Sequence, residues 1–106
     1  MNTSGRIDAI KKMLETEPDD LFLNYSLGIE YLSNQLHQEA IIQFKKSLSI
    51  NPDYFTAHYQ LGKLFEQINV PNSAIHHYKL GLAIATKLKH NKAINEFNEA
   101  LFLIED

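Results

Sequence analysis

The chain has 106 residues and no cysteine, so it is long enough for one domain but cannot form a disulfide, a thiolate zinc site or a cysteine nucleophile. Hydrophobic residues make up 44% and charged residues 22%, with a formal net charge of −3, which is typical of a folded globular protein and not of a disordered one. Its longest uncharged stretches are interrupted by polar residues and its N-terminus lacks the apolar run of a signal peptide, so we expect a cytoplasmic protein without a membrane span.

The choice of apolar residues predicts an all-α protein. The chain has fourteen Leu and eight Ala but a single Val, and β-branched or aromatic residues do not alternate with polar ones over the length of a strand. Prolines and glycines then mark where helices begin and end. The pattern predicts six helices, at about residues 5–16, 20–34, 37–50, 54–68, 72–89 and 92–104.

The first predicted helix is half of a repeat. It carries Ile7, Ile10 and Leu14 at helical spacing, and its end runs through Lys11-Lys12-x-Leu14-x-x-x-Pro18. The same pattern of residues recurs 34 positions later as Lys45-Lys46-x-Leu48-x-x-x-Pro52. Residues 5–18 therefore correspond to the second half of a unit whose first half is missing.

The next four predicted helices form two full repeats, residues 19–52 and 53–88. Each repeat contains two helices that we expect to pack in antiparallel fashion, and we expect Asp19 and Asp53 to cap the first helix of each pair. An offset of 34 residues aligns the two repeats with nine identities, which are Asp19/Asp53, Tyr25/Tyr59, Leu27/Leu61, Gly28/Gly62, Ala40/Ala74, Ile41/Ile75, Lys45/Lys79, Leu48/Leu82 and Ile50/Ile84.

The last predicted helix, residues 92–104, echoes these landmarks in a shifted frame. Leu80-Gly81-x-x-Ile84 is followed by Ala93-x-x-x-Phe97, as though a further helix pair began within the preceding helix. We therefore expect a turn near residues 90–91 and a terminal helix that folds back to cover the stack, although one helix continuing over 72–104 is also compatible with the sequence.

These landmarks resemble the tetratricopeptide repeat, whose signature W-x2-L-G-x2-Y, A-x3-F, P has a period of 34 residues. The matching residues are Leu27-Gly28-x-x-Tyr31, Ala40-x-x-x-Phe44 and Pro52, and in the second copy Leu61-Gly62-x-x-Phe65 and Ala74-x-x-x-Tyr78. The chain departs from the signature in three places. Asn24 and His58 replace the tryptophan, Gln35 and Asn69 replace the inter-helix turn glycine, and Thr86 replaces the second closing proline.

The resemblance implies a small α-solenoid of antiparallel helix pairs that forms a single helical-repeat domain over residues 1–106. It also implies a non-catalytic adaptor or scaffold that binds a peptide or helix of a partner in a concave groove, which is lined by the first helix of each repeat. The groove positions that the core does not require are Phe22, Tyr25, Ile29 and Ser33 in the first repeat, and Thr56, Tyr59, Gln60, Lys63 and Gln67 in the second.

Three occupants of this groove are compatible with the sequence: a segment of another protein, a second copy of the chain in a homodimer, or the chain's own N-terminal helix. Self-association is the alternative function, because a stack this short has barely the three repeats that stability usually requires. Family members that bind a C-terminal carboxylate carry Lys and Asn where this chain has Tyr25 and Ile29. A receptor of that type is therefore disfavoured.

The remaining chemistry-bearing residues do not form a recognisable site. None of the five histidines has a histidine partner four residues away, and no nucleophile elbow, glycine-rich phosphate loop or HExxH motif occurs. We therefore expect no enzyme activity, no metal and no cofactor. Residues 67–95 carry four lysines and no acid, but without arginine or interleaved stacking residues they do not predict nucleic-acid binding.

Overall fold

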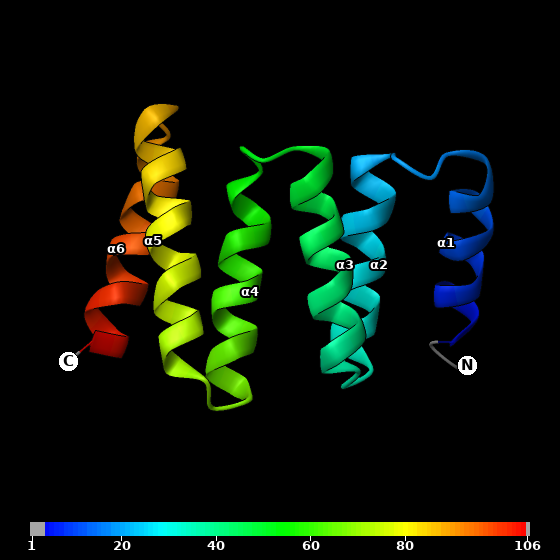
Figure 1. The fold of residues 1–106 in the computed structure, drawn as a ribbon, viewed down its shortest axis with the longest axis horizontal. Coiled ribbons are helices and arrows are strands. Elements are labelled where there is room, and N and C mark those ends of the chain that lie inside the picture. Colours follow the sequence, from blue (N-terminus) through cyan, green and yellow to red (C-terminus); the bar gives the residue numbers. More distant parts are fainter. Residues whose placement is uncertain (1–3, 106) are drawn as a thin grey trace. The chain divides into compact units, whose positions relative to one another are not determined.

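Six α-helices follow one another in the computed structural model, which describes residues 4–105 (Figure 1). The all-α prediction is confirmed, and the predicted helix ends differ from the observed ones by at most two residues. No strand occurs among the described residues. The helices are α1 (Ser4–Thr16), α2 (Leu21–Ser33), α3 (His37–Ile50), α4 (Phe55–Gln67), α5 (Pro71–Lys87) and α6 (Asn91–Glu105).

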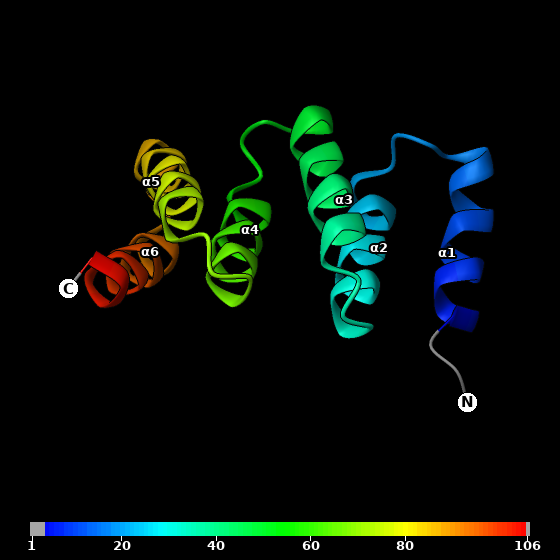
Figure 2. The same cartoon turned by 60° about the horizontal axis from the view of Figure 1, so that its bottom comes forward.

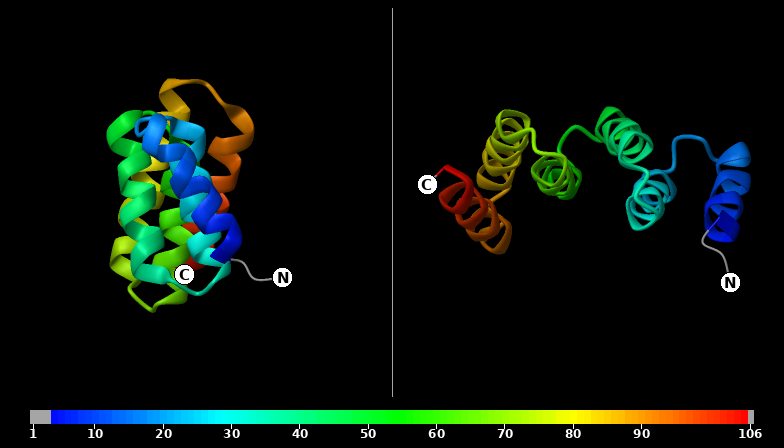
Figure 3. Two further views of the ribbon diagram at one scale, coloured as in Figure 1. Left: turned by 90° about the vertical axis from the view of Figure 1, so that its right-hand side faces the viewer. Right: turned by 90° about the horizontal axis from the view of Figure 1, so that it is seen from below.

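Two compact units divide the chain between Pro52 and Asp53. The first contains α1, α2 and α3, and the second contains α4, α5 and α6. Within each unit, helices that are consecutive in sequence pack against each other: α2 contacts α1 and α3, and α5 contacts α4 and α6. Figures 2 and 3 show the antiparallel pairing of α2 with α3 and of α5 with α6.

A glycine on one helix faces an aromatic ring on the next helix in three of these pairs. If the glycines carried a Cβ atom, it would lie within 3.0 Å of at least two ring carbons, which is closer than real Cβ contacts come. The bare backbone therefore lets the ring lie directly on the helix. Sixteen residues separate the partners each time: Gly28 with Phe44, Gly62 with Tyr78 and Gly81 with Phe97.

The contact between Gly81 and Phe97 positions α6 against α5. Tyr78 of α5 fills the space beside α4, while Gly81 of the same helix receives Phe97 of α6. Phe97 is also 5.5 Å from Tyr59 and 6.4 Å from Phe55, measured between ring centroids. The predicted terminal helix is thus confirmed, and the alternative of one helix over 72–104 is wrong, because the chain turns between Lys87 and Asn91.

The turn after α2, α4 and α5 has the same geometry each time. Gln35, Asn69 and Lys89 have φ values of 63°, 63° and 57°, the left-handed conformation that glycine adopts most easily. Two backbone hydrogen bonds close each turn as a Schellman motif. The outer bonds run from the N–H of Leu36 to the carbonyl of Tyr31, from Val70 to Phe65 and from His90 to Ala85, at 2.8–2.9 Å.

The predicted helix caps at Asp19 and Asp53 are wrong. The N-cap of α2 is Asp20, whose carboxylate accepts a hydrogen bond of 2.8 Å from the backbone N–H of Leu23. The N-cap of α4 makes no side-chain capping bond, and the carboxylate of Asp53 instead pairs with Lys87 Nζ at 2.9 Å. Adjacent carboxylates are equivalent in sequence, but a cap depends on which of them has an extended backbone just before the first turn.

The glycine contacts can be tested with Gly28→Ala. Helix propensity alone would make this change stabilising by about 1 kcal/mol. We expect instead a loss of about 1–3 kcal/mol in the free energy of unfolding by urea, because the methyl group overlaps the Phe44 ring. In a Phe44→Leu background the penalty should shrink, and an equal penalty in both backgrounds would contradict the proposed overlap.

The turns can be tested with Gln35→Gly and Asn69→Gly. A left-handed backbone costs a residue other than glycine roughly 1–2 kcal/mol, and asparagine tolerates it better than glutamine. We expect Gln35→Gly to raise the free energy of unfolding by about 0.5–1 kcal/mol after the extra entropy of the unfolded glycine is subtracted. Asn69→Gly should raise the free energy of unfolding by a smaller amount. A lower melting temperature for Gln35→Gly would argue against a strained turn.

Candidate partner-binding site

The four predicted groove residues of the first repeat share one side of α2. Phe22 is 74% exposed, Ile29 is half-buried, and Ser33 is exposed with its hydroxyl donating to the Ile29 carbonyl at 3.1 Å. Tyr25 is half-buried, and its ring centroid lies 5.6 Å from that of Phe44. Tyr25 therefore belongs partly to the core of the first unit, whereas Phe22 gives that unit little packing.

The five predicted groove residues of the second repeat lie along α4 and differ in exposure. Thr56, Tyr59 and Gln60 are half-buried, whereas Lys63 and Gln67 are exposed. This face of α4 is therefore largely polar, in contrast to the apolar face of α2.

Tyr59 is the aromatic residue of this set, and it packs against two neighbouring helices. Its ring centroid lies 5.9 Å from that of Tyr78 and 5.5 Å from that of Phe97, so α5 and α6 both pack against it. The ammonium nitrogen of Lys63 lies 5.6 Å from the centroid of the Tyr59 ring, within the range of a cation–π interaction.

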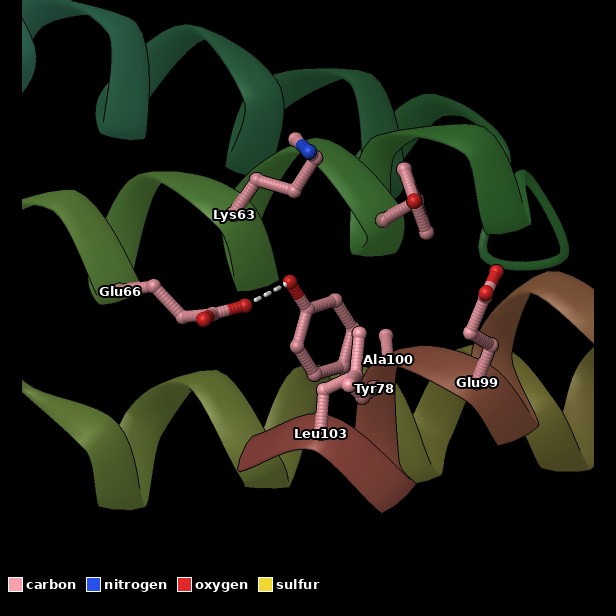
Figure 4. A pocket seen from close by; sticks show the side chains of 7 residues that line it. Lys63, Glu66, Tyr78, Glu99, Ala100 and Leu103 are labelled. Atoms are coloured by element: carbon pink, nitrogen blue, oxygen red, sulfur yellow. Dashed lines mark hydrogen bonds between the residues drawn. The ribbon is translucent and has the colours of Figure 1, made fainter. Parts of the chain in front are cut away.

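A pocket of about 190 Å³ opens among α4, α5 and α6 beside Tyr59 (Figure 4). On one side of it the Tyr78 hydroxyl donates a short hydrogen bond to Glu66. Glu99 lies on the opposite side, on α6. The residues that line the pocket are Tyr59, Lys63, Glu66, Tyr78, Glu99, Ala100 and Leu103.

Burial raises the pKa of Tyr78 well above its ordinary value, and the hydrogen bond to the Glu66 carboxylate raises it further. The phenol therefore stays protonated at physiological pH and acts as a hydrogen-bond donor to Glu66. The charged groups that line the pocket are therefore two carboxylates, Glu66 and Glu99, and one ammonium group, that of Lys63.

The pocket combines predicted and unpredicted residues. Tyr59 and Lys63 are predicted groove residues, whereas the other five lining residues are not. Three of these five, Glu99, Ala100 and Leu103, belong to α6. A 19-residue offset in the sequence maps Gly62 and Tyr78 onto Gly81 and Phe97. This offset indicates that α6 packs on α5 as α5 packs on α4, and it could have identified the pocket residues of α6.

The sequence and the architecture of this chain match known proteins. The tetratricopeptide repeat family model matches residues 28–69. A tetratricopeptide repeat domain protein from Salinibacter ruber, whose structure was solved in solution, is 31% identical, with a TM-score of 0.78 and coverage of 83% of this chain and 89% of that one. The chain belongs to the tetratricopeptide repeat family.

Two more distant matches agree with this assignment. The TPR2B domain of yeast Sti1, solved as a complex with pHsp70, has a TM-score of 0.87 over 97% of this chain and 82% of that chain, at 13% identity, so it shows a shared fold. The peroxisomal targeting signal receptor of Candida albicans is 28% identical over 82% of this chain. The chain spans only 16% of that receptor's length. Tetratricopeptide repeats are in general protein-interaction modules and typically not catalytic.

In this tetratricopeptide fold, two side-chain contacts from α1 reach α2 at residues outside the predicted groove positions. Arg6 of α1 pairs with Glu30 at 3.8 Å, and Lys11 Nζ lies 5.9 Å from the ring centroid of Tyr31. Glu30 and Tyr31 lie roughly 100° or more around the helix from Ile29. These contacts therefore do not support the idea that the N-terminal helix covers its own groove.

The tryptophan position of the tetratricopeptide signature holds a polar residue in both repeats, and each residue bonds to a partner nineteen residues later. In the first repeat the Gln43 side-chain amide donates to Asn24 Oδ1 at 2.6 Å. In the second, His58 Nδ1 lies 3.1 Å from His77 Nδ1, so one ring must donate and the other accept. A search for histidine partners four residues apart does not find this pair, because its members are nineteen residues apart and lie on different helices.

The lowered pKa of His58 should make stability depend on pH. Burial lowers the pKa of His58, and the nearby positive charge of His76 lowers it further. The unfolded state then binds more protons than the folded state as the pH falls below about 6.5, so the free energy of unfolding should decrease through this window.

The pH dependence can be isolated with His58→Asn/His77→Gln, which installs the Asn–Gln pair of the first repeat. We expect urea denaturation between about pH 7.5 and 5 to show a smaller loss of stability in this variant than in the wild type. An identical pH dependence in both proteins would contradict the role of His58.

The described residues offer little other ligand chemistry. No group of three or more His, Asp or Glu side chains among residues 4–105 is arranged to hold a metal ion. Likewise, none of the described helices combines the length and apolar character needed to cross a bilayer.

Proposed function

We propose that this protein is a non-catalytic adaptor or scaffold module that binds a peptide or helix of a partner protein. The first helix of each repeat supplies the contacts. On α2 these are apolar, from Phe22, Tyr25 and Ile29. On α4, Tyr59 supplies an aromatic surface, with Gln60 and Lys63 as polar groups that orient the bound segment.

The exposure of Phe22 carries this proposal. A phenylalanine that is 74% exposed leaves most of its ring in water, and Tyr25 and Ile29 follow it at i+3 and i+7 on the same side of α2. An apolar stripe of this kind on a folded protein is typical of a surface that another molecule covers. Because Phe22 adds little to the packing of its own unit, its role fits binding better than stability.

Membership of the tetratricopeptide family supports the same class of function. The distant fold relative in yeast Sti1 was solved bound to pHsp70, and the Candida albicans relative is a targeting signal receptor. Both names concern recognition of another polypeptide. Tyr25 and Ile29 indicate a different ligand chemistry from that of family members that bind a terminal carboxylate.

A photo-crosslinking amino acid at position 22 tests the proposal directly. The matched control is position 42 on α3, where Ile42 is 66% exposed but lies outside the predicted groove. In the native host we expect position 22, but not position 42, to form an adduct with another protein. Phe22→Asp should abolish co-purification of that protein without changing the melting temperature, whereas Tyr25→Asp would also disturb the contact with Phe44.

The same experiment distinguishes binding of a partner protein from self-association, the alternative function. Adducts between two copies of the chain at position 22, together with a dimer that light scattering shows to be lost in Phe22→Asp, would instead mean that the surface is buried by self-association. Equal adducts at positions 22 and 42 would contradict a specific surface on α2.

A further inference from the structure

The pocket beside Tyr59 is acidic, and its two carboxylates come from different helices. Glu66 lies near the end of α4, and Glu99 lies in the middle of α6. Both line the same opening, as Figure 4 shows. Glu99 makes no ion pair with any described residue. Glu66 accepts one bond from Tyr78, and a carboxylate has lone pairs for further donors.

The rings in this pocket already attract a cation. The Lys63 ammonium group lies 5.6 Å from the centroid of the Tyr59 ring. Lys63 is exposed and reaches the ring on a flexible side chain, so an incoming cation can displace it from the ring at low cost. Its ammonium group can then contact another part of the bound segment.

Beside Glu99, α6 also contributes apolar side chains to the pocket lining. These are Ala100 and Leu103, and Leu103 is 70% exposed. A ligand group that matches all these features has an apolar stem and a planar cationic end. The stem would lie on Leu103, and the cationic end would reach a carboxylate and a tyrosine ring.

We propose that this pocket binds an arginine side chain of the partner segment. The inference rests on the proposed function and specifies the chemistry of its ligand. Arginine fits better than lysine, because a planar guanidinium group can stack on the Tyr59 ring while it donates to a carboxylate at the edge of the pocket. The excess of negative charge also disfavours an acidic partner segment at this position.

Nuclear magnetic resonance of the full chain tests the pocket with a defined probe. The probe is the acetylated and amidated peptide Gly-Leu-Arg-Gly, and its matched control carries citrulline, which has the same shape as arginine without the charge. We expect the arginine peptide to shift the backbone signals of Tyr59, Ala100 and Leu103 with a dissociation constant in the millimolar range, about 1–10 mM. The citrulline peptide should bind about five- to tenfold more weakly.

Variants assign the effect to the two carboxylates. Glu66→Gln/Glu99→Gln keeps an acceptor for the Tyr78 hydroxyl and should weaken the arginine peptide about five- to tenfold. The control Glu39→Gln/Glu96→Gln removes the same charge from two exposed residues outside the pocket and should leave the affinity unchanged. Circular dichroism and melting temperature verify that both variants fold.

Lys63→Gln gives a test in the opposite direction. It removes the cation that competes for the Tyr59 ring, so the arginine peptide should bind about threefold more tightly. An unchanged or weaker affinity would overturn the inference, because the arginine would then not take the place of Lys63. Four other results would also overturn the inference. The arginine and citrulline peptides could bind equally well, or the signal shifts could be confined to other helices. The arginine peptide could cause no shifts at about 10 mM, or its affinity could be the same for the Glu66→Gln/Glu99→Gln variant and the wild type.

Failure of this inference can be told apart from failure of the proposed function. If the protein crosslinked at position 22 binds the Glu66→Gln/Glu99→Gln variant as tightly as the wild type, the arginine pocket is refuted and the interaction module stands. If the arginine peptide occupies the pocket but position 22 captures no partner, the pocket chemistry stands and the proposed function of the α2 surface is refuted.

Discussion

The close contact between a glycine and an aromatic ring is the constraint on which the rest of this structure depends. It brings neighbouring helices together without an intervening side chain, and it fixes where along each helix the partner crosses. Gly81 matters most, because it gives α5 a second contact of this kind. Tyr78 of α5 packs on Gly62 of α4, and Gly81 of α5 accommodates Phe97 of α6. This second contact helps to hold α6 on α5, together with Ala85, Ala93 and Leu101 of the same core cluster. The pocket depends on it, because α6 supplies part of the pocket lining.

The sequence contained most of the fold because its determinants are local and repeated. Prolines, glycines and apolar periodicity placed every helix, and the 34-residue offset paired them correctly. The turns could be located but their geometry could not be read from residue type. Gln35 and Lys89 adopt a backbone conformation that favours glycine, because the hydrogen bonds on either side of them close the Schellman motif whichever residue is present.

The candidate site was less predictable, because its contacts join different helices. Repeat position alone pointed to Phe22, Tyr59 and Lys63. It could not place Glu99 in the same pocket as Tyr59, since this depends on how α6 lies on α5. The bond between His58 and His77 was missed for a related reason: a search for partners four residues away examines one helix only.

The two repeats use the same framework for different surface chemistry. The positions equivalent by the repeat offset are Phe22 and Thr56, and Ile29 and Lys63, so the apolar stripe of α2 becomes a polar face on α4. The fold tolerates this divergence because these side chains contribute little to the glycine–aromatic contacts. On the proposed function, apolar contact with α2 would supply much of the affinity, since burial of a phenylalanine is worth about 1.5–3 kcal/mol. The charged pocket beside α4 would supply selectivity, because exposed ion pairs discriminate between partners more than they stabilise a complex.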